Sequence, residues 1–359
     1  MTGVSVVVPT LGRPGLTTLL RALAAASPAP LPVELLLVDD RPAPARELPL
    51  PPGVDPKVLS GRAAGPAAAR NVGWRAASHE WVAFLDDDVV PDPDWLVRLA
   101  ADLTGAPAAV GGVQGRLRVP LPADRRPTDW ERVTAGLADG AWITADMAYR
   151  RDALAATGGF DERLPRAFRE DAELAHRVRA AGWELARGTR AVAHPVRPED
   201  RWVSLRTQRG NADDALLRRL YGRGWRTDLD IPPGRRPRHL AVTTAAALAA
   251  AGLATAGLAT AGLATAWSAG RSEAEARPTT GRRGVTGRRG ALTVAALSAA
   301  VWVVGTAEFA AARIKPGPRD RREVVTMLAT SAAIPPVAVA HWLRGWIRWR
   351  GARPMEPAQ

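Results

Sequence analysis

The segment that decides the fold is residues 81–96, which read WVAFLDDDVVPDPDWL. Its first five residues are apolar and form a run of the length of a buried strand, and Asp86, Asp87 and Asp88 follow directly. Three adjacent carboxylates repel one another, so we expect a divalent cation that prefers oxygen ligands, Mg²⁺ or Mn²⁺. In an extended segment Asp86 and Asp88 point the same way. A solvated acidic turn before Pro91 is the alternative.

Strands and helices alternate around this segment. A helix with leucines at 3.6-residue spacing is expected after Pro14. Further apolar runs typical of strands lie at residues 4–8, 33–38 and 108–113. The alternation predicts an α/β fold, a parallel sheet with helices on both faces, in which ligands bind at the carboxyl ends of the strands.

Polar residues lie where the expected strands end. The first strand leads into Pro9, Thr10 and Arg13, and the second into Asp39 and Asp40. We therefore expect these residues, together with the three aspartates, to face a ligand at one edge of the sheet.

Four other positions have both a structural and a functional interpretation. The fork of Arg70, which precedes Asn71, matches phosphate oxygens, although a lone arginine is often a surface charge. Glu170 and Asp171 begin a helix, where acids also serve as ordinary partners of the helix dipole. His194 ends a short Ala–Val run, and a lone histidine is often structural.

The order and spacing of these motifs resemble the family 2 glycosyltransferases, which have the GT-A nucleotide-sugar fold. The resemblance covers about residues 3–200. It rests on six motifs in order: VVVPTLGRP at 6–14, LLLVDD at 35–40, AAARNVG at 67–73, FLDDDVVPDPDWL at 84–96, ADMAYRRDAL..TGGFDERL at 145–164 and REDAELAHRVRAAGW at 169–183.

The resemblance implies roles residue by residue. Asp86 and Asp88 match the DxD metal motif, and His194 matches a histidine that joins the metal or diphosphate. Asp171, with Glu170, matches the acid pair that supplies the general base. The residues implied in donor binding are Pro9, Thr10, Arg13, Asp39, Asp40, Arg70, Asn71, Asp86 and Asp87.

Two departures from the family pattern affect what the resemblance implies. Asp146 stands where many relatives carry Asn, which puts its contact with donor or acceptor in doubt. Relatives that make long polymers carry QxxRW after the base, whereas here Gln208 and Arg209 are followed by Gly210 and Asn211. Single or few sugar additions are therefore favoured over processive synthesis.

Charge and composition divide the chain of 359 residues into two parts. Residues 1–233 hold 31 basic and 30 acidic side chains, whereas residues 234–359 hold 18 and 6. We therefore expect a neutral catalytic domain over 1–233 and a basic region over 234–359 that meets an anionic membrane surface, and no nucleic-acid partner. Cysteine is absent, which excludes disulfides and thiolate metal sites. No secretory signal is evident at the start, so the catalytic domain is expected on the cytoplasmic side of the cell membrane.

Hydrophobic segments lie near 240–270, 291–312 and 324–343, and a helix needs about 20 apolar residues to span a bilayer. Short positively charged loops normally stay cytoplasmic, yet basic residues lie between each pair of segments, so the topology is left open. Trp342, Trp346 and Trp349 share one helical face opposite Arg344 and Arg348, an interfacial anchor pattern; a buried helix of a soluble domain is the alternative.

The function expected from the resemblance is an inverting, metal-dependent sugar transfer. The donor would be a nucleotide-diphosphate sugar, with UDP favoured, and the acceptor a hydroxyl of a glycan or a lipid-linked molecule. Two alternatives from other classes are a nucleotidyltransferase that makes nucleotide-sugars and a catalytically inactive membrane scaffold. The first would need a Gly-rich, Lys-containing loop near the N-terminus, which is lacking.

Overall fold

The protein is represented by a computed structural model that describes residues 3–44, 46–269 and 280–355, with side chains between 259 and 287 excepted. Two compact units are present. The sheet unit comprises Met1–Asp200, Ala212–Pro233 and Arg344–Gln359, and the helical unit comprises Arg201–Asn211 and Gly234–Leu343. The sheet unit also includes residues 344–359, which lie after the predicted domain boundary at residue 233. That residues 1–233 fold independently therefore stays a prediction.

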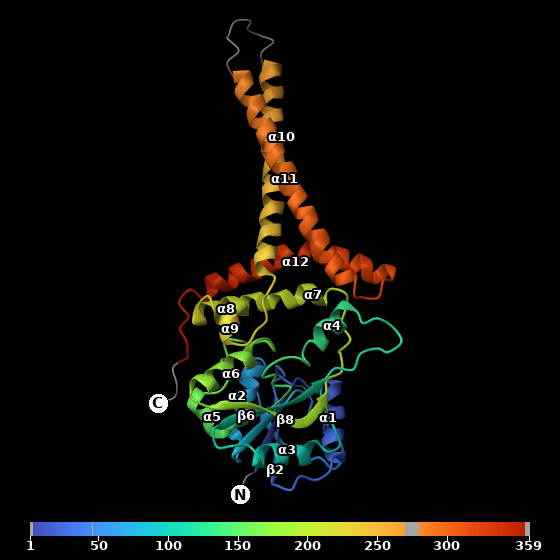
Figure 1. Ribbon diagram of the computed structural model, residues 1–359, viewed down its shortest axis with the longest axis vertical. Helices are drawn as coiled ribbons and strands as arrows, with labels where there is room; N and C mark the ends of the chain where they lie inside the picture. Colours follow the sequence, from blue (N-terminus) through green and yellow to red (C-terminus); the bar gives the residue numbers. More distant parts are fainter. Residues whose placement is uncertain (1–2, 45, 270–279, 356–359) are drawn as a thin grey trace. The chain divides into compact units, whose positions relative to one another are not determined.

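The centre of the sheet unit is an eight-stranded sheet in the order β3-β2-β1-β4-β7-β6-β8-β5. Figure 1 shows this sheet with helices beside it. Its strands are β1 (Val4–Thr10), β2 (Val33–Asp39), β3 (Lys57–Ser60), β4 (Trp81–Leu85), β5 (Val90–Pro91), β6 (Val110–Arg118), β7 (Asp146–Arg150) and β8 (Glu184–Ala193). The four strands at the β3 side are parallel, as predicted.

The prediction of an all-parallel sheet is wrong for the other half, which makes the sheet mixed. Strand β7 runs antiparallel to both β4 and β6, and β5 runs antiparallel to β8. Between β6 and β7 lies only a loop with the short helix α4 (Asp129–Ala135), so no crossover returns the chain to the start of the sheet. The predicted α/β class, a sheet with helices on both faces, is confirmed.

Helices cover both faces because side chains along a strand alternate. Val6 and Val8 of β1 point into a core with α1 (Pro14–Ala25) and α3 (Trp95–Thr104). Val7 points to the opposite core, which holds α2 (Pro66–Ala76), α5 (Arg151–Thr157) and α6 (Glu170–Ala180). The carboxyl ends of β1 and β4, where the predicted polar residues lie, therefore open between two covered faces.

A third core joins the last residues of the chain to the sheet unit. Leu216 and Leu217 of α8 (Asn211–Tyr221) and Trp225 of α9 (Trp225–Asp228) are buried in it, and Trp349 packs against it. The guanidinium of Arg219 lies 3.3 Å from the ring centroid of Trp346. Trp346 and Trp349 thus contact protein within the sheet unit, and the interfacial anchor stays a prediction.

The helical unit consists of α7 (Val203–Arg206), the short 3₁₀ helix η1 (Thr207–Gly210), α10 (Arg236–Ala269), α11 (Thr280–Ile314) and most of α12 (Arg321–Arg348). The predicted hydrophobic segments fall within the three long helices, except that Gly270 lies outside the described residues. By length and composition alone, three stretches could span a membrane: Arg236–Leu258, Arg288–Ile314 and Arg321–Arg348.

Candidate functional site

A cavity of about 640 Å³ opens at the carboxyl ends of β1 and β4. It is lined by charged and small residues from several loops, as expected for a ligand site at such an edge. The predicted site residues that line it are Pro9, Thr10, Arg13, Asp40, Arg70, Asp86, Asp87 and Asp88.

Asp87 connects the acidic segment to the end of the first strand. Its buried carboxylate accepts hydrogen bonds from Thr10 Oγ1 at 2.7 Å and from the Leu11 amide at 3.3 Å. Arg13 Nη1 lies 3.9 Å from the same carboxylate. These contacts occupy Asp87 with protein, so they fix the cavity wall and leave Asp86 and Asp88 to face the ligand.

Asp86, Asp88 and His194 bring one ligand atom each to within 4.8 Å of one another, a spacing at which a metal ion could be held. Residues 86–88 form a turn after β4, not the extended segment predicted, yet the two carboxylates still converge. Burial, followed by the neighbouring Asp86, raises the pKa of Asp88. His194 Nδ1 is buried and has no hydrogen-bond partner among the described residues. Oxygen and imidazole ligands with repelling carboxylates fit Mg²⁺ or Mn²⁺.

Arg70 joins this group to the predicted catalytic pair. Its side chain is 1% exposed. Nη2 donates to Asp86 Oδ1 at 2.7 Å, and Nη1 donates to Glu170 Oε1 at 2.9 Å. Nε has no hydrogen-bond partner among the described residues. Contact of Arg70 with a diphosphate stays a prediction; in the structure its guanidinium already donates hydrogen bonds to the carboxyl groups of Asp86 and Glu170.

Glu170 and Asp171 form the first turn of α6, after Arg169 in a left-handed conformation with φ of 78°. Glu170 is 2% exposed, whereas Asp171 is partly exposed and accepts a hydrogen bond from the Ala172 amide at 2.7 Å. Neither carboxylate lines the cavity. Burial, then the charge of Asp171, raises the pKa of Glu170 to about 8 against the opposing effect of Arg70. Burial also raises the pKa of Asp171.

Asp39 and Asn71, which are both predicted to bind the donor, do not line the cavity. The Asp39 carboxylate is held by Arg41, whose Nε and Nη2 donate at 2.8 and 2.7 Å, and this hydrogen bonding lowers the pKa of Asp39. Asp40 lines the cavity and accepts from the Arg62 and Gly65 amides at 3.0 and 2.9 Å.

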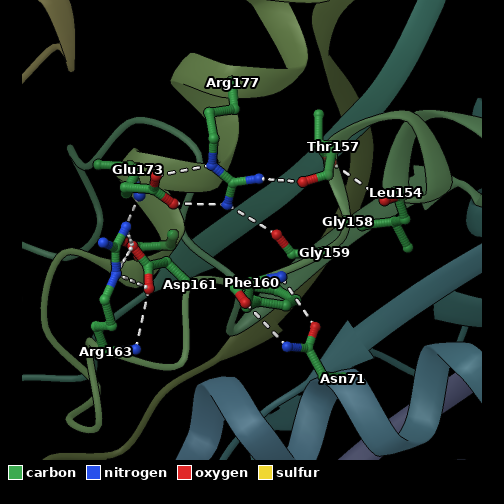
Figure 2. Close-up of polar contacts among 12 residues, drawn as sticks. Asn71, Leu154, Thr157, Gly158, Gly159, Phe160, Asp161, Arg163, Glu173 and Arg177 are labelled. Carbon is green, nitrogen blue, oxygen red and sulfur yellow. Dashed lines mark hydrogen bonds and ion pairs between the residues drawn. The ribbon is translucent and has the colours of Figure 1, made fainter. Parts of the chain in front are cut away.

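The side chain of Asn71 holds the turn at Gly158 and Gly159 (Figure 2). Its amide exchanges two hydrogen bonds of 2.9 Å with the Phe160 backbone. From the other side, Arg177 donates to the Gly159 carbonyl at 2.7 Å. Both glycines have positive φ, and a Cβ on Gly159 would lie 2.4 Å from Asn71 Oδ1. In the structure the side chain of Asn71 is thus engaged by the turn, and its donor-binding role stays a prediction.

Sequence reasoning missed Arg197, which lines the cavity and donates from Nε to Asp88 Oδ2 at 2.9 Å. It lies three residues after His194, and no pattern around it distinguishes it from other arginines of the chain. Its position in the loop after β8 gives the cavity a third guanidinium, in addition to those of Arg13 and Arg70.

Asp146 belongs to a different cluster, buried among β7, α3 and β8. Arg190 Nε donates to Asp146 Oδ1 at 2.7 Å and its Nη1 lies 3.2 Å from Asp102 Oδ2. The Trp95 indole donates to the other Asp146 oxygen at 2.9 Å. Asp146 has no solvent exposure and is not among the residues that line the cavity.

Comparison with known proteins supports the family resemblance. Residues 5–151 match the family model "Glycosyl transferase family 2". "Succinoglycan biosynthesis protein ExoM" of Rhizobium meliloti (strain 1021) is 30% identical over 159 residues, 42% of this chain and 52% of that protein. "Pre-mycofactocin glycosyltransferase" of Mycobacterium tuberculosis (strain ATCC 25618 / H37Rv) is 33% identical over 153 residues, 39% of this chain and 32% of that protein. The matches thus span about half of one relative and a third of the other.

Solved structures also resemble the chain at low identity. Staphylococcus aureus TarS 1–349 in complex with UDP has 20% identity and a TM-score of 0.42, over 64% of this chain and 70% of that one. The mannosyltransferase PcManGT from Pyrobaculum calidifontis, in complex with GDP-Man and Mn²⁺, has 16% identity and a TM-score of 0.46, over 97% and 88%.

Proposed function

We propose that this chain, whose residues 5–151 match the glycosyl transferase family 2, moves a sugar from a nucleotide-diphosphate sugar to a hydroxyl acceptor with inversion at the sugar carbon. The observation that carries the proposal is the convergence of Asp86, Asp88 and His194 at a cavity that Arg70 links to Glu170. Metal ligands and a separate acid pair, joined by one arginine, are the parts that this reaction needs.

In this proposal one set of residues stabilises the leaving diphosphate and another activates the acceptor hydroxyl. Asp86, Asp88 and His194 would hold Mg²⁺ or Mn²⁺, which when bound supplies positive charge for the diphosphate as it leaves. Arg197 and Arg13 add guanidinium groups at the same cavity, and Asp40 borders the space for the nucleoside.

Asp171 is the proposed general base that takes the proton of the acceptor hydroxyl. It is partly exposed, whereas Glu170 is buried and paired with Arg70. A raised pKa is what a base near neutral pH requires, and burial raises that of Asp171. Glu170, the first residue of helix α6, accepts a hydrogen bond from Arg70 and is proposed to position Asp171 beside it.

The donor and acceptor are proposed at the level of chemical class. A UDP-sugar is the favoured donor, and a glycan or lipid-linked hydroxyl is the acceptor. Apolar helices in residues 234–348 support attachment to the cell membrane, with the catalytic domain proposed on the cytoplasmic side. The names of the two relatives point to different products, succinoglycan and mycofactocin, so neither is taken as this chain's product.

The test is a donor screen with the full-length protein that follows release of nucleoside diphosphate, with Mn²⁺, with Mg²⁺ and with EDTA. We expect release from one nucleotide-sugar, dependent on a divalent cation. Asp152→Ala, which changes an exposed carboxylate of α5, is the matched control and should leave release unchanged. Pyrophosphate release from a nucleoside triphosphate and a sugar phosphate would establish the nucleotidyltransferase alternative. A folded protein with no turnover of any donor would favour the scaffold.

A further inference from the structure

The route of the chain through the sheet unit limits how often it can cross a membrane. The chain leaves this unit after Pro233 and returns to it at Arg344. The returning segment is packed in place: Arg219 Nη2 donates to the Trp346 carbonyl at 3.1 Å, and a Cβ on Gly345 would lie 2.5 Å from the oxygen of Ala212. A folded unit that contains both segments lies on one side of a membrane, so the number of crossings between them is even.

The three helices that are long enough to span would give an odd number. Of these, α10 and α11 lie antiparallel and packed along their length. A Cβ on Gly305 would meet Val242 at 2.5 Å, and one on Gly252 would meet Ala295 at 2.9 Å. Helices packed in this way cross together, which leaves α12 as the one that does not. We propose that only α10 and α11 cross the membrane and that α12 lies along its surface, with one apolar face in the lipid.

The two faces of α12 differ as this arrangement requires. Thr330 and Ser331 are fully buried on one side, where both hydroxyl oxygens accept hydrogen bonds from Arg313 at 2.8 and 3.1 Å. The other side is apolar and exposed along the length of the helix, with exposed fractions of 56% for Val325, 51% for Leu328, 48% for Leu343 and 65% for Ile347. Apolar side chains on the outside suit a lipid environment and are costly in water. We call these four residues the α12 apolar stripe.

The distribution of positive charge separates two crossings from three. Near the ends of the helices, residues 234–240, 313–322 and 344–353 contain three, five and four Lys or Arg, and residues 271–289 contain six. With two crossings, the side of the sheet unit carries twelve of these charges and the far side six. With three, residues 344–353 move across and leave eight against ten. Basic residues accumulate on the cytoplasmic side, so two crossings also satisfy this rule.

The arginines at both ends of α12 identify its partner as an anionic bilayer surface. Arg321 and Arg322 precede the stripe, and Arg344 and Arg348 accompany its end. All four can reach phosphates of the same leaflet only if the helix lies parallel to the surface. The inference rests on the membrane attachment proposed above and does not depend on sugar transfer. A full-length protein that is recovered in the soluble fraction refutes the attachment, whereas a membrane protein with the wrong sidedness refutes only the inference.

Because the chain has no cysteine, single cysteines report one position at a time. Pro318→Cys lies between α11 and α12, Pro354→Cys lies after α12, and Arg288→Cys marks the other end of the α11 stretch. Each full-length variant is treated with a membrane-impermeant maleimide in sealed right-side-out and inside-out vesicles. We expect Pro318→Cys and Pro354→Cys to react in the same preparation and Arg288→Cys in the other. Reaction of the first two in opposite preparations, or of all three in both, overturns the proposal.

A second measurement identifies what covers the stripe. Leu328→Cys and Leu343→Cys carry a fluorophore in vesicles of phosphatidylethanolamine and phosphatidylglycerol that contain brominated lipids. Thr330→Cys, on the buried side, is the matched control. We expect both stripe positions to be quenched most by bromine near the headgroup and the control to be quenched little. Quenching by deep bromine at either position indicates a crossing helix, and cross-linking between copies without lipid quenching indicates a second copy of the chain; each overturns the proposal.

Discussion

Two charged clusters lie in the same sheet unit and differ in how completely their charges are partnered. The closed cluster consists of Arg190, Asp146 and Asp102 with the indole of Trp95, and the open cluster consists of Asp86, Asp88, His194, Arg70 and Glu170. In the closed cluster Arg190 also donates to the Val113 carbonyl at 2.7 Å. A buried charge group with full hydrogen bonding stabilises one packing of the sheet.

The open cluster is almost as buried but incompletely partnered. Arg70 Nε, Glu170 Oε2 and His194 Nδ1 have no hydrogen-bond partner among the residues that the structure describes. Leaving a buried polar atom unpaired costs about 1–3 kcal/mol. Such a cost is tolerated where a ligand provides the missing interactions, and perturbed carboxylates of this kind concentrate at functional sites. The difference teaches that buried charge alone does not mark a site, whereas buried charge with unpaired atoms does.

The largest effect should come from removing the proposed base. Asp171→Asn keeps the size of the side chain and removes its basicity, so turnover should fall about 10²–10⁴-fold. Donor affinity should change less than about tenfold, or ~1.4 kcal/mol, because the ligands of the metal are untouched. Turnover and nucleotide binding are measured on the same preparation. Glu170→Gln is the companion variant and should lose less turnover; a dead Glu170→Gln beside an active Asp171→Asn would assign the base to the other residue.

Breaking the closed cluster should reduce stability and leave binding intact. Arg190→Met removes the partner of Asp146 and Asp102, and an uncompensated buried charge costs about 3–5 kcal/mol. Urea unfolding followed by tryptophan fluorescence measures the loss. The double variant Arg190→Met with Asp146→Asn should recover part of it, because one stranded charge is gone. Unchanged stability in Arg190→Met, or reduced nucleotide affinity in its folded fraction, would contradict the structural role.

Local patterns were sufficient to predict the elements that carry the site. Strand β4 was predicted with its observed bounds, and the helix after Pro14 begins there, because an unbroken apolar run and a proline at a helix start are short-range signals. The antiparallel course of β7 was not predicted, since strand direction depends on long-range pairing. Strand β8 was missed for a local reason, because its sequence ELARGTRAVA has no clean alternation of apolar and polar residues.

The site was predicted in part. The metal group Asp86, Asp88 and His194 was predicted from the motif order, and the structure brings its ligand atoms together. Arg197 was missed, and the contacts of Asp146 were found only in the structure. The sequence does not distinguish Asp88, which lines the cavity, from Asp146, which is buried against an arginine. Only the tertiary contacts of Arg197 and Arg190 separate the two.

A smaller effect is expected on donor binding when the open cluster loses one carboxylate. Asp88→Ala removes a proposed metal ligand, so nucleotide affinity in the presence of Mn²⁺ should fall at least about tenfold, or ~1.4 kcal/mol. In EDTA, wild type and variant should bind equally weakly. Titration calorimetry measures both conditions, with Asp152→Ala as the exposed control. If affinity with Mn²⁺ is the same in Asp88→Ala as in wild type, the metal assignment is wrong.

The last effect concerns the pH dependence of stability, and Glu170 is expected to supply it. Burial raises the pKa of Glu170 to about 8 in the folded protein, against an ordinary value of 4.5. Between these values the unfolded chain has lost the proton and the folded chain keeps it, so each rise in pH favours unfolding. The slope is at most ~1.4 kcal/mol per pH unit, and the folded pKa of about 8 already includes the opposing effect of Arg70. Stability relative to Glu170→Gln, which does not titrate, should therefore be highest near pH 5 and decline toward pH 8 in urea unfolding. A difference that is constant over this range, or that grows in favour of wild type, would mean that Glu170 is ionised throughout and that its ion pair with Arg70 outweighs its burial.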